Sequence, residues 1–268
     1  MENLENTFPV VIRQEFTPHI ANTIFNLLDE DKLVKSRSVS SVWKDVVDSR
    51  TDLWNDPQLY SEAAWEGNIE ICRLFLDHSD DKNPKDDQDG STPLHSAARA
   101  GNPEGEEIYR LIMKEVDDKN PKDKRGSTPL HNAARYGNFE VSKLIVENVD
   151  EKNPATIGDR NTPLHDAASF GHADIFRLIF EKVEDKNPPD SWGNTPLHLV
   201  CRNQFQENLP RESQRFAVEM CRLILDHVDD KYPVNHQGET PLDMAREWFQ
   251  EEEDLEELEQ LWLNEGDQ

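Results

Sequence analysis

The chain has 268 residues, of which 55 are Asp or Glu and 29 are Lys or Arg, and its formal net charge at pH 7 is −26. This excess of acid argues against binding to nucleic acid, because phosphate contacts need clustered cations, and against attachment to an anionic membrane surface. The N-terminus has no basic stretch followed by an apolar one, and no apolar run approaches the roughly 18 residues of a membrane helix. We therefore expect a soluble protein of the cytoplasm or the nucleus.

Residues 1–15 are interpreted as a tail, and residues 16–56 as a first, separate module. Apolar residues recur at helical spacing after Thr17-Pro18, and the module continues with Val-Ser-Ser-Val-Trp at 39–43 and Leu-Trp at 53–54. These positions fit three short helices separated by polar turns. The pattern resembles an F-box, although the usual Leu before the proline is replaced by Thr17 and the usual acid after the proline is missing.

By this resemblance, the module docks on a Skp-type adaptor and thereby links the chain to a cullin ubiquitin ligase. Such docking is helix packing, so the apolar side chains divide between the module's own small core and the adaptor. The residues expected to bind the adaptor are Ile20, Ile24, Leu28, Leu33, Val39 and Trp43. The alternative is that these helices only cap the exposed side of the first repeat.

The rest of the chain is repetitive. Thr-Pro-Leu-His occurs at 92–95, 128–131, 162–165 and 195–198, and Thr-Pro-Leu-Asp follows at 240–243. A period of 33 to 36 residues between the first four copies indicates stacked supersecondary units rather than one globular core. In such a stack the recurring side chains hold the units together, and specificity lies in those that do not recur.

Each unit contains the signals of two helices. Thr suits the N-cap and Pro the first turn. In three units an Ala-Ala pair, at 97–98, 133–134 and 167–168, lets neighbouring helices approach closely, and Gly101, Gly137 and Gly171 suit a left-handed helix end. A second apolar helix comes next, and Asp-Lys-Asn-Pro, or once Glu-Lys-Asn-Pro, forms the turn to the next unit. The repeat resembles the ankyrin repeat, which implies an all-α solenoid of helix-turn-helix units with short β-turn or hairpin loops.

We expect about six such units over residues 57–263, followed by a tail at 264–268. The first unit, around residues 63–68, lacks the Thr-Pro start. The fifth carries an insertion near 204–215, which we interpret as a surface connection between its two helices. The last contains the acidic run 251–259, and an acidic outer face suits the end of a solenoid that is exposed to water.

One histidine recurs in the first helix of four units, at His95, His131, His165 and His198. These histidines lie about one repeat apart, which is too far for one metal ion to bind two of them. By the ankyrin resemblance, they cap helices and bond to a neighbouring turn. The sequence also has no phosphate loop, nucleophile elbow or Cys-His pairing. We therefore expect no metal, no cofactor and no enzymatic activity, and we expect a monomer.

The ankyrin resemblance places partner binding on the concave side, at the loop tips and the first helices. Several positions that the repeat leaves free there carry aromatic or arginine side chains, which are typical of binding anchors. The residues expected to bind a target are Trp65, Arg99, Arg135, Tyr136, Phe170 and Trp192. The alternative is that these side chains only pack on neighbouring units.

Two functions are compatible with these patterns. In the first, the chain is the substrate receptor of a Skp-cullin-F-box type ubiquitin ligase and holds a protein target on its repeats. In the second, it is a plain ankyrin scaffold or inhibitor that recruits no ligase. A basic and aromatic strip on so acidic a chain favours a target segment that carries acids and apolar anchors.

Overall fold

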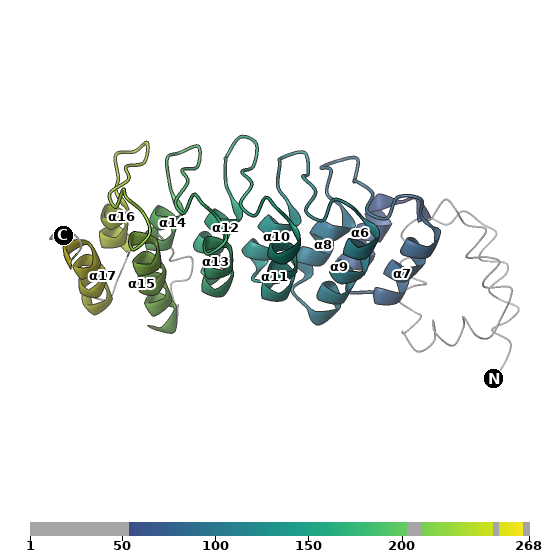
Figure 1. The fold of residues 1–268 in the computed structure, drawn as a ribbon, viewed down its shortest axis with the longest axis horizontal. Coiled ribbons are helices and arrows are strands. Elements are labelled where there is room, and N and C mark those ends of the chain that lie inside the picture. Colours follow the sequence, from purple (N-terminus) through teal and green to yellow (C-terminus); the bar gives the residue numbers. More distant parts are fainter. Residues whose placement is uncertain (1–53, 203–210, 249–251, 265–268) are drawn as a thin grey trace, which may run out of the picture.

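The structure is a computed structural model that describes residues 54–202, 211–248 and 252–264 (Figure 1). Within these ranges the chain forms twelve α-helices and no strand. In chain order they are α6 (Pro57–Trp65), α7 (Ile69–His78), α8 (Pro93–Ala100), α9 (Pro103–Glu115), α10 (Pro129–Tyr136), α11 (Phe139–Asn148), α12 (Pro163–Phe170), α13 (Ala173–Phe180), α14 (Pro196–Arg202), α15 (Arg211–Leu225), α16 (Pro241–Trp248) and α17 (Glu252–Asn264). The predicted all-α solenoid is confirmed.

Some predictions fall outside the described residues. The expected adaptor-binding residues all precede residue 54 and are Ile20, Ile24, Leu28, Leu33, Val39 and Trp43. The assignment of 16–56 to an F-box-like module therefore stays a prediction. Much of the expected insertion also lies outside the description, at 203–210, but α15 begins at Arg211. Residues 211–215 thus belong to the second helix of the fifth unit, and the connection is shorter than predicted.

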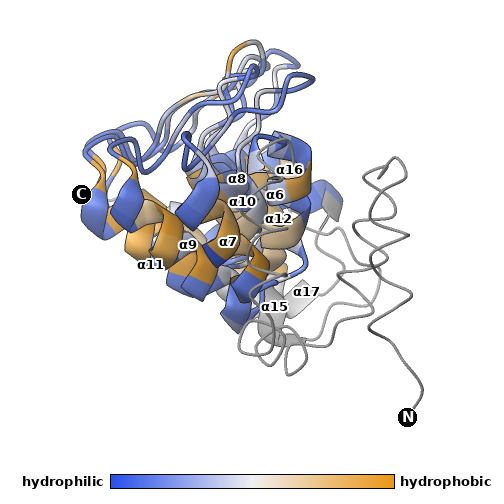
Figure 2. Ribbon diagram, turned by 90° about the vertical axis from the view of Figure 1, so that its right-hand side faces the viewer, coloured by the Kyte–Doolittle hydropathy of each residue, from blue (hydrophilic) through white to orange (hydrophobic). Residues whose placement is uncertain are grey.

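Consecutive helices pair into six units, and the units stack in one direction (Figure 1). The first helices form one layer, in which α6, α8, α10, α12, α14 and α16 each pack on the next. The second helices, from α7 to α17, form the other layer in the same way. Figure 2 looks along the stack and shows that the loops between units project from the helices on one side.

The first helices begin and end where the repeated residues require. Thr128 is the N-cap of α10 with Pro129 in the first turn, and Gly137 ends this helix in the left-handed conformation, with φ 74°. A Cβ added at Gly137 would lie 2.6 Å from Cε1 of His172 in the next unit. The backbone conformation therefore favours glycine at this position, and an added Cβ would also force the His172 ring to move.

The first three residues of Asp-Lys-Asn-Pro each form hydrogen bonds in the turn between units. In the first such turn, Oδ1 of Asp81 accepts a hydrogen bond from the amide of Asn83 (3.0 Å), and Nζ of Lys82 donates to the carbonyl of Leu76 at the end of α7 (2.7 Å). Oδ1 of Asn83 in turn accepts from the amide of Leu94 in α8 (3.1 Å). The motif therefore satisfies backbone groups at the end of one helix and the start of the next.

The repeated histidines connect the second to the sixth units, each to the next. In the second unit, Nδ1 of His95 accepts from the backbone amide of Thr92 (3.1 Å), and Nε2 lies 3.1 Å from the carbonyl oxygen of Ser127 in the following unit. Because an amide can only donate, Nδ1 carries no hydrogen, and Nε2 donates to the carbonyl. The neutral ring is therefore the form that the fold requires.

The same arrangement is present at His131, His165 and His198, whose Nε2 atoms lie 3.2 Å from the carbonyl oxygens of Asn161, Asn194 and Glu239. In the last unit the histidine is replaced by Asp243. Its Oδ2 accepts from the amide and the hydroxyl of Thr240, at 3.0 and 2.7 Å. The acid keeps the helix cap but cannot donate to a further unit, which suits the end of the stack.

We predict that the protein loses stability as the pH falls below about 6.5, the ordinary pKa of histidine. Burial lowers the pKa of His131 to about 3 and also lowers those of His95, His165 and His198. Between the two values the unfolded chain binds protons that the folded chain excludes, so the free energy of unfolding falls by about 1.4 kcal/mol per pKa unit for each such histidine. Urea unfolding at pH 7.5 and pH 5.0 measures the difference in the free energy of unfolding.

The control variant is His131→Gln, because Gln also completes a capping box but does not titrate. It should lower stability at pH 7.5 and reduce the difference between the two pH values. Asp166 acts in the opposite direction, since burial raises its pKa to about 6 and the folded chain binds its proton first. A parent protein that is equally stable at both pH values and a variant with the same profile would contradict the role of the neutral rings.

The loops between units are joined to one another by single backbone hydrogen bonds. These run from the amides of Lys124, Ile157, Ser191 and His236 to the carbonyls of Asp89, Arg125, Asp159 and Trp192, at 2.9, 2.7, 2.9 and 2.8 Å. One bond per step aligns neighbouring loops without forming a strand. In the loop before α12, Arg160 has a φ of 57°, whereas the corresponding residue of the loop before α8 is Gly90, with φ 76°. Arg160 is thus strained.

We predict that Arg160→Gly stabilises the protein. The left-handed conformation costs a residue with a Cβ about 1–2 kcal/mol, and the added freedom of glycine in the unfolded chain offsets about 0.5–1 kcal/mol of the gain. The net increase in the free energy of unfolding should be up to about 1 kcal/mol, measured by urea unfolding. Gly90→Ala is the reciprocal control and should destabilise the protein. A decrease for Arg160→Gly would show that the side chain of Arg160 stabilises its loop.

Candidate protein-binding surface

The C-terminal ends of the first helices bring five of the six predicted target-binding residues together. Arg99, at the end of α8, has its Cζ 4.4 Å from the ring centroid of Trp65 at the end of α6. The same Cζ lies 5.2 Å from the ring of Tyr136 at the end of α10. The guanidinium of the second unit is therefore stacked by aromatic rings from the units on either side.

The next step of this arrangement joins the third and fourth units. Cζ of Arg135 lies 5.8 Å from the ring centroid of Phe170, and its Nη2 and Nε lie 2.9 and 3.3 Å from Oδ1 of Asp166. Asp166 is almost fully buried, and burial raises the pKa of its carboxyl to about 6, although Arg135 acts against this rise. Its other oxygen, Oδ2, has no hydrogen-bond partner. Arg135 thus has an ion-pair partner within the protein.

We name the surface formed by Trp65, Arg99, Arg135, Tyr136 and Phe170 the ridge. The aromatic members are partly exposed to solvent: 38% of Trp65, 46% of Tyr136 and 52% of Phe170 remain accessible. The stacks hold these side chains in place while leaving much of their surface free. The contacts also show that part of each side chain does pack on a neighbouring unit, as the alternative interpretation required.

Trp192, the sixth predicted residue, lies elsewhere. It is in the loop before α14, where its carbonyl accepts from the amide of His236, and 53% of its side chain is exposed. No ring contact joins it to the ridge in the described part of the chain. Ile157, which is 75% exposed in the loop before α12, was not singled out from the sequence. The sequence feature that indicates an exposed apolar side chain here is an isoleucine in an otherwise polar loop.

Comparison with known families agrees with the geometry of the stack. The family model for ankyrin repeats (three copies) matches residues 60–157, 104–190 and 147–211 in overlapping segments, which together cover more than half of the chain. The chain belongs to the ankyrin-repeat family. No F-box motif is detected, and no curated protein matches the chain. Ankyrin repeats are scaffolds for protein–protein interaction and are generally not catalytic.

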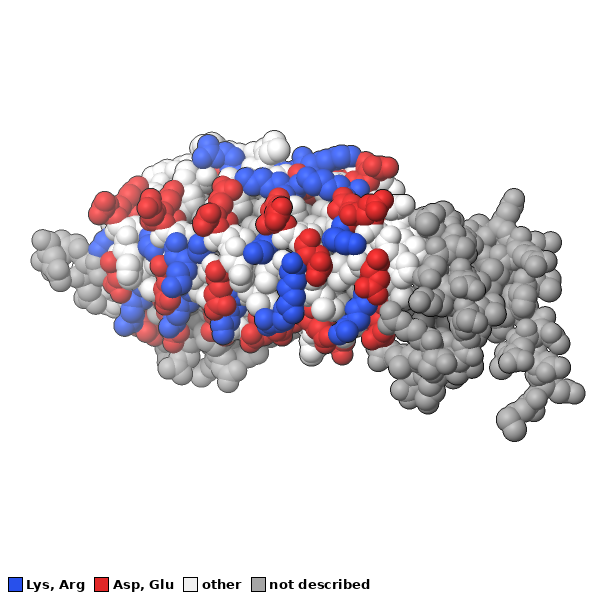
Figure 3. Space-filling view, turned by 45° about the vertical axis from the view of Figure 1, so that its right-hand side comes forward, with Lys and Arg blue, Asp and Glu red and all other residues white. Residues whose placement is uncertain are grey.

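The second helices of the ankyrin units present a different surface. Figure 3 shows Lys and Arg interspersed with Asp and Glu across it. Three ion pairs join neighbouring second helices, Arg73 to Glu107, Arg177 to Glu219 and Arg222 to Glu257. All six side chains are well exposed, so each pair contributes little to stability. This surface is mixed in charge and lacks the aromatic stacks of the ridge.

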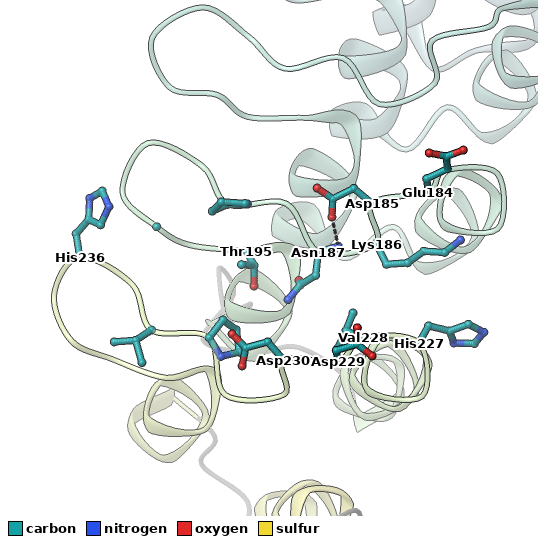
Figure 4. A pocket seen from close by; sticks show the side chains of 14 residues that line it. Glu184, Asp185, Lys186, Asn187, Thr195, His227, Val228, Asp229, Asp230 and His236 are labelled. Atoms are coloured by element: carbon teal, nitrogen blue, oxygen red, sulfur yellow. Dashed lines mark hydrogen bonds between the residues drawn. The ribbon is translucent and has the colours of Figure 1, made fainter.

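A cavity of about 560 Å³ lies between the fifth and sixth ankyrin units (Figure 4). Its acidic side chains come from the turns that enter these units and are Glu184, Asp185, Asp229 and Asp230. The Nζ of Lys186 donates to the carbonyl of Phe180 and lies 4.7 Å from that ring, and no ion pair with these acids is found in the described residues. Within the described residues, no group of three acidic, histidine or cysteine side chains could hold a metal ion.

The cysteines offer no reactive group. Cys72, Cys201 and Cys221 are free and buried, and the Sγ atoms of Cys201 and Cys221 lie 3.6 Å apart. Burial raises the pKa of the Cys201 thiol well above its ordinary value. A thiol that stays protonated is a poor nucleophile, so we interpret this pair as packing between α14 and α15.

Among the described residues, no helix has the length and apolarity needed to cross a membrane.

Proposed function

We propose that this ankyrin protein is a substrate receptor that holds a protein target on its ridge and recruits a Skp-type adaptor, and with it a cullin ubiquitin ligase, through residues 16–56. The ridge carries the first half of this proposal. Its side chains occupy positions that the repeat pattern leaves variable, although Arg135 also pairs with the buried Asp166, and their stacks fix them before any partner arrives. Fixed side chains lose little conformational entropy on binding, and such residues dominate the energetics of protein interfaces.

The second half of the proposal is supported by the sequence of the N-terminal module and by the way it joins the array. The Val-Ser-Ser-Val-Trp and Leu-Trp matches to the F-box pattern end at Trp54. Trp54 is only 2% exposed, and its ring lies 5.2 Å from that of Phe75 and 5.3 Å from that of His78. The last residue of the matched pattern is therefore buried in the first ankyrin unit, which supports a direct connection between the proposed module and the array.

The same observation favours the second candidate function. Since Trp54 fills the core of the first unit, residues 16–56 could serve the array alone, as a cap. The protein would then be a scaffold or an inhibitor that binds its target and recruits nothing. The two candidates share the ridge and differ only in what the N-terminal residues bind.

For the ridge, we predict that Tyr136→Ala and Phe170→Ala each weaken target binding by at least about 2 kcal/mol, as the loss of an aromatic anchor does. The target is first recovered by co-purification with the full chain, and its affinity is then measured by titration calorimetry. Arg135→Ala is less informative, because it would leave the buried Asp166 without its cation and lower stability.

The matched controls are Lys143→Ala and Glu147→Ala, two exposed positions on the second helix α11. Both should bind the target as the parent does. Trp192→Ala tests separately whether the loops share in binding. Normal binding by both ridge variants, together with loss of binding after changes in α17, would place the target on the C-terminal cap instead.

For the adaptor, we predict that deletion of residues 1–53 abolishes pull-down of a Skp-type adaptor and leaves the ankyrin units folded, since solenoid stability is a sum of local interfaces. The deletion keeps Trp54 and Asp56, whose Oδ1 accepts from the amides of Gln58 and Leu59 at the start of α6. Trp43→Ala in the full chain should weaken adaptor binding.

Circular dichroism and the melting temperature report on the array in the same samples. Equal adaptor binding by the full and shortened chains would rule out the receptor function. A large drop in melting temperature on deletion, with no adaptor binding by the full chain, would establish the N-terminal residues as a cap.

A further inference from the structure

Two arginines occupy the same position in successive ankyrin units, but only one has an ion-pair partner. Arg135 of the third unit reaches Asp166 in the fourth, with an Nη2–Oδ1 distance of 2.9 Å. Arg99 belongs to the second unit, and in the third unit the position of Asp166 is occupied by Asn132. Nδ2 of Asn132 donates to the carbonyl of His95 at 3.1 Å. Over the described ranges, no carboxylate or other hydrogen-bond acceptor contacts Arg99.

The aromatic neighbours of Arg99 cover the guanidinium but do not accept hydrogen bonds from its N–H groups. Trp65 and Tyr136 stack on the guanidinium from opposite neighbours in the array, at 4.4 and 5.2 Å from Cζ. The two rings restrict the movement of the guanidinium without using its N–H groups, which stay available as hydrogen-bond donors. Arg99 is exposed, so these donors face solvent. An oriented, unpaired guanidinium is a preformed site for a planar anion.

We propose that Arg99 recognises an Asp or Glu side chain of the target, and that an apolar side chain beside this acid packs on Trp65 or Tyr136. The proposal rests on the proposed function, because it assumes that the ridge is the face that binds the target. It adds the chemistry of the target segment: a carboxylate with an aromatic or branched aliphatic neighbour.

The protein itself contains an example of the group that we propose for Arg99. At the equivalent position one unit further along, an arginine of the same ridge binds a carboxylate, that of Asp166. Phospho-group recognition typically uses a cluster of arginines, whereas the second cation of the ridge, Arg135, is already paired with that acid. The observed pair therefore favours a carboxylate over a phosphate.

The experiment selects binders of the full chain from a phage library that displays random peptides of about twelve residues. The selected peptides are then synthesised, and their affinities are measured by fluorescence anisotropy. The parent should select peptides that contain Asp or Glu next to an aromatic or branched aliphatic residue. Arg99→Gln should lower the affinity of such a peptide at least about tenfold, as the loss of a charge-assisted pair at an interface does. Arg99→Lys keeps the charge without the planar donors and should lose less.

A second variant leaves Arg99 in place. Asn132→Asp introduces a carboxylate at the position that Asp166 occupies one unit later, so it should pair with Arg99 and lower peptide affinity to a similar extent. Asp166→Asn is the reciprocal change; it frees Arg135 and should raise the affinity for peptides with two acids. Lys143→Gln removes one positive charge from the second-helix face and should leave affinity unchanged, which separates the site from a general effect of charge.

The outcomes distinguish this proposal from the function on which it rests. If Arg99→Gln and Asn132→Asp bind the selected peptide as the parent does, while Tyr136→Ala does not, the ridge is the binding face but Arg99 does not recognise an acid. If all three variants bind normally, the ridge assignment also fails. Three other results would contradict the proposal that Arg99 recognises a carboxylate. They are selection of peptides without acids, selection of no peptide, and competition by inorganic phosphate but not by acetate.

Discussion

The hydrogen bond from Nε2 of each repeated histidine to a backbone carbonyl of the next unit is the interaction on which the remaining structure depends. A unit of two short helices has little core of its own, so its stability comes from contact with neighbours. The imidazole satisfies the first amide of its own helix through Nδ1 and fixes the next loop through Nε2, at 3.1–3.2 Å in all four cases. Helix start, loop position and unit spacing are thereby set by one side chain.

Because those recurring residues already hold the stack, the remaining positions are free to vary. The ridge lies at two of them, just before the helix-ending glycine, where the repeat pattern does not specify the side chain. This separation explains how a chain with a net charge of −26 can present arginines between aromatic rings on one face. The acids lie mainly on the loops, the second helices and the last unit, and they do not neutralise Arg99.

The sequence was sufficient to predict the stack, its period and the close approach of the aromatic and arginine positions, because all of these follow from residues at fixed places in the repeat. It was not sufficient to predict which arginine is free. That depends on whether the neighbouring unit has Asn132 or Asp166, and the contact appears only when two units are placed side by side. The left-handed conformation of Arg160 and the separation of Trp192 from the ridge likewise depend on loop geometry that no periodic pattern encodes.

The replacement of histidine by Asp243 has a consequence for how such an array can change in length. The third, fourth and fifth units each give a histidine bond to the following unit and receive one from the preceding unit, so duplicating or deleting one of them leaves these bonds matched. A unit added after the sixth would offer a carbonyl to a carboxylate, two acceptors facing each other. A further unit bonded in the same way would therefore need Asp243→His, because only the imidazole supplies the donor that the next loop accepts.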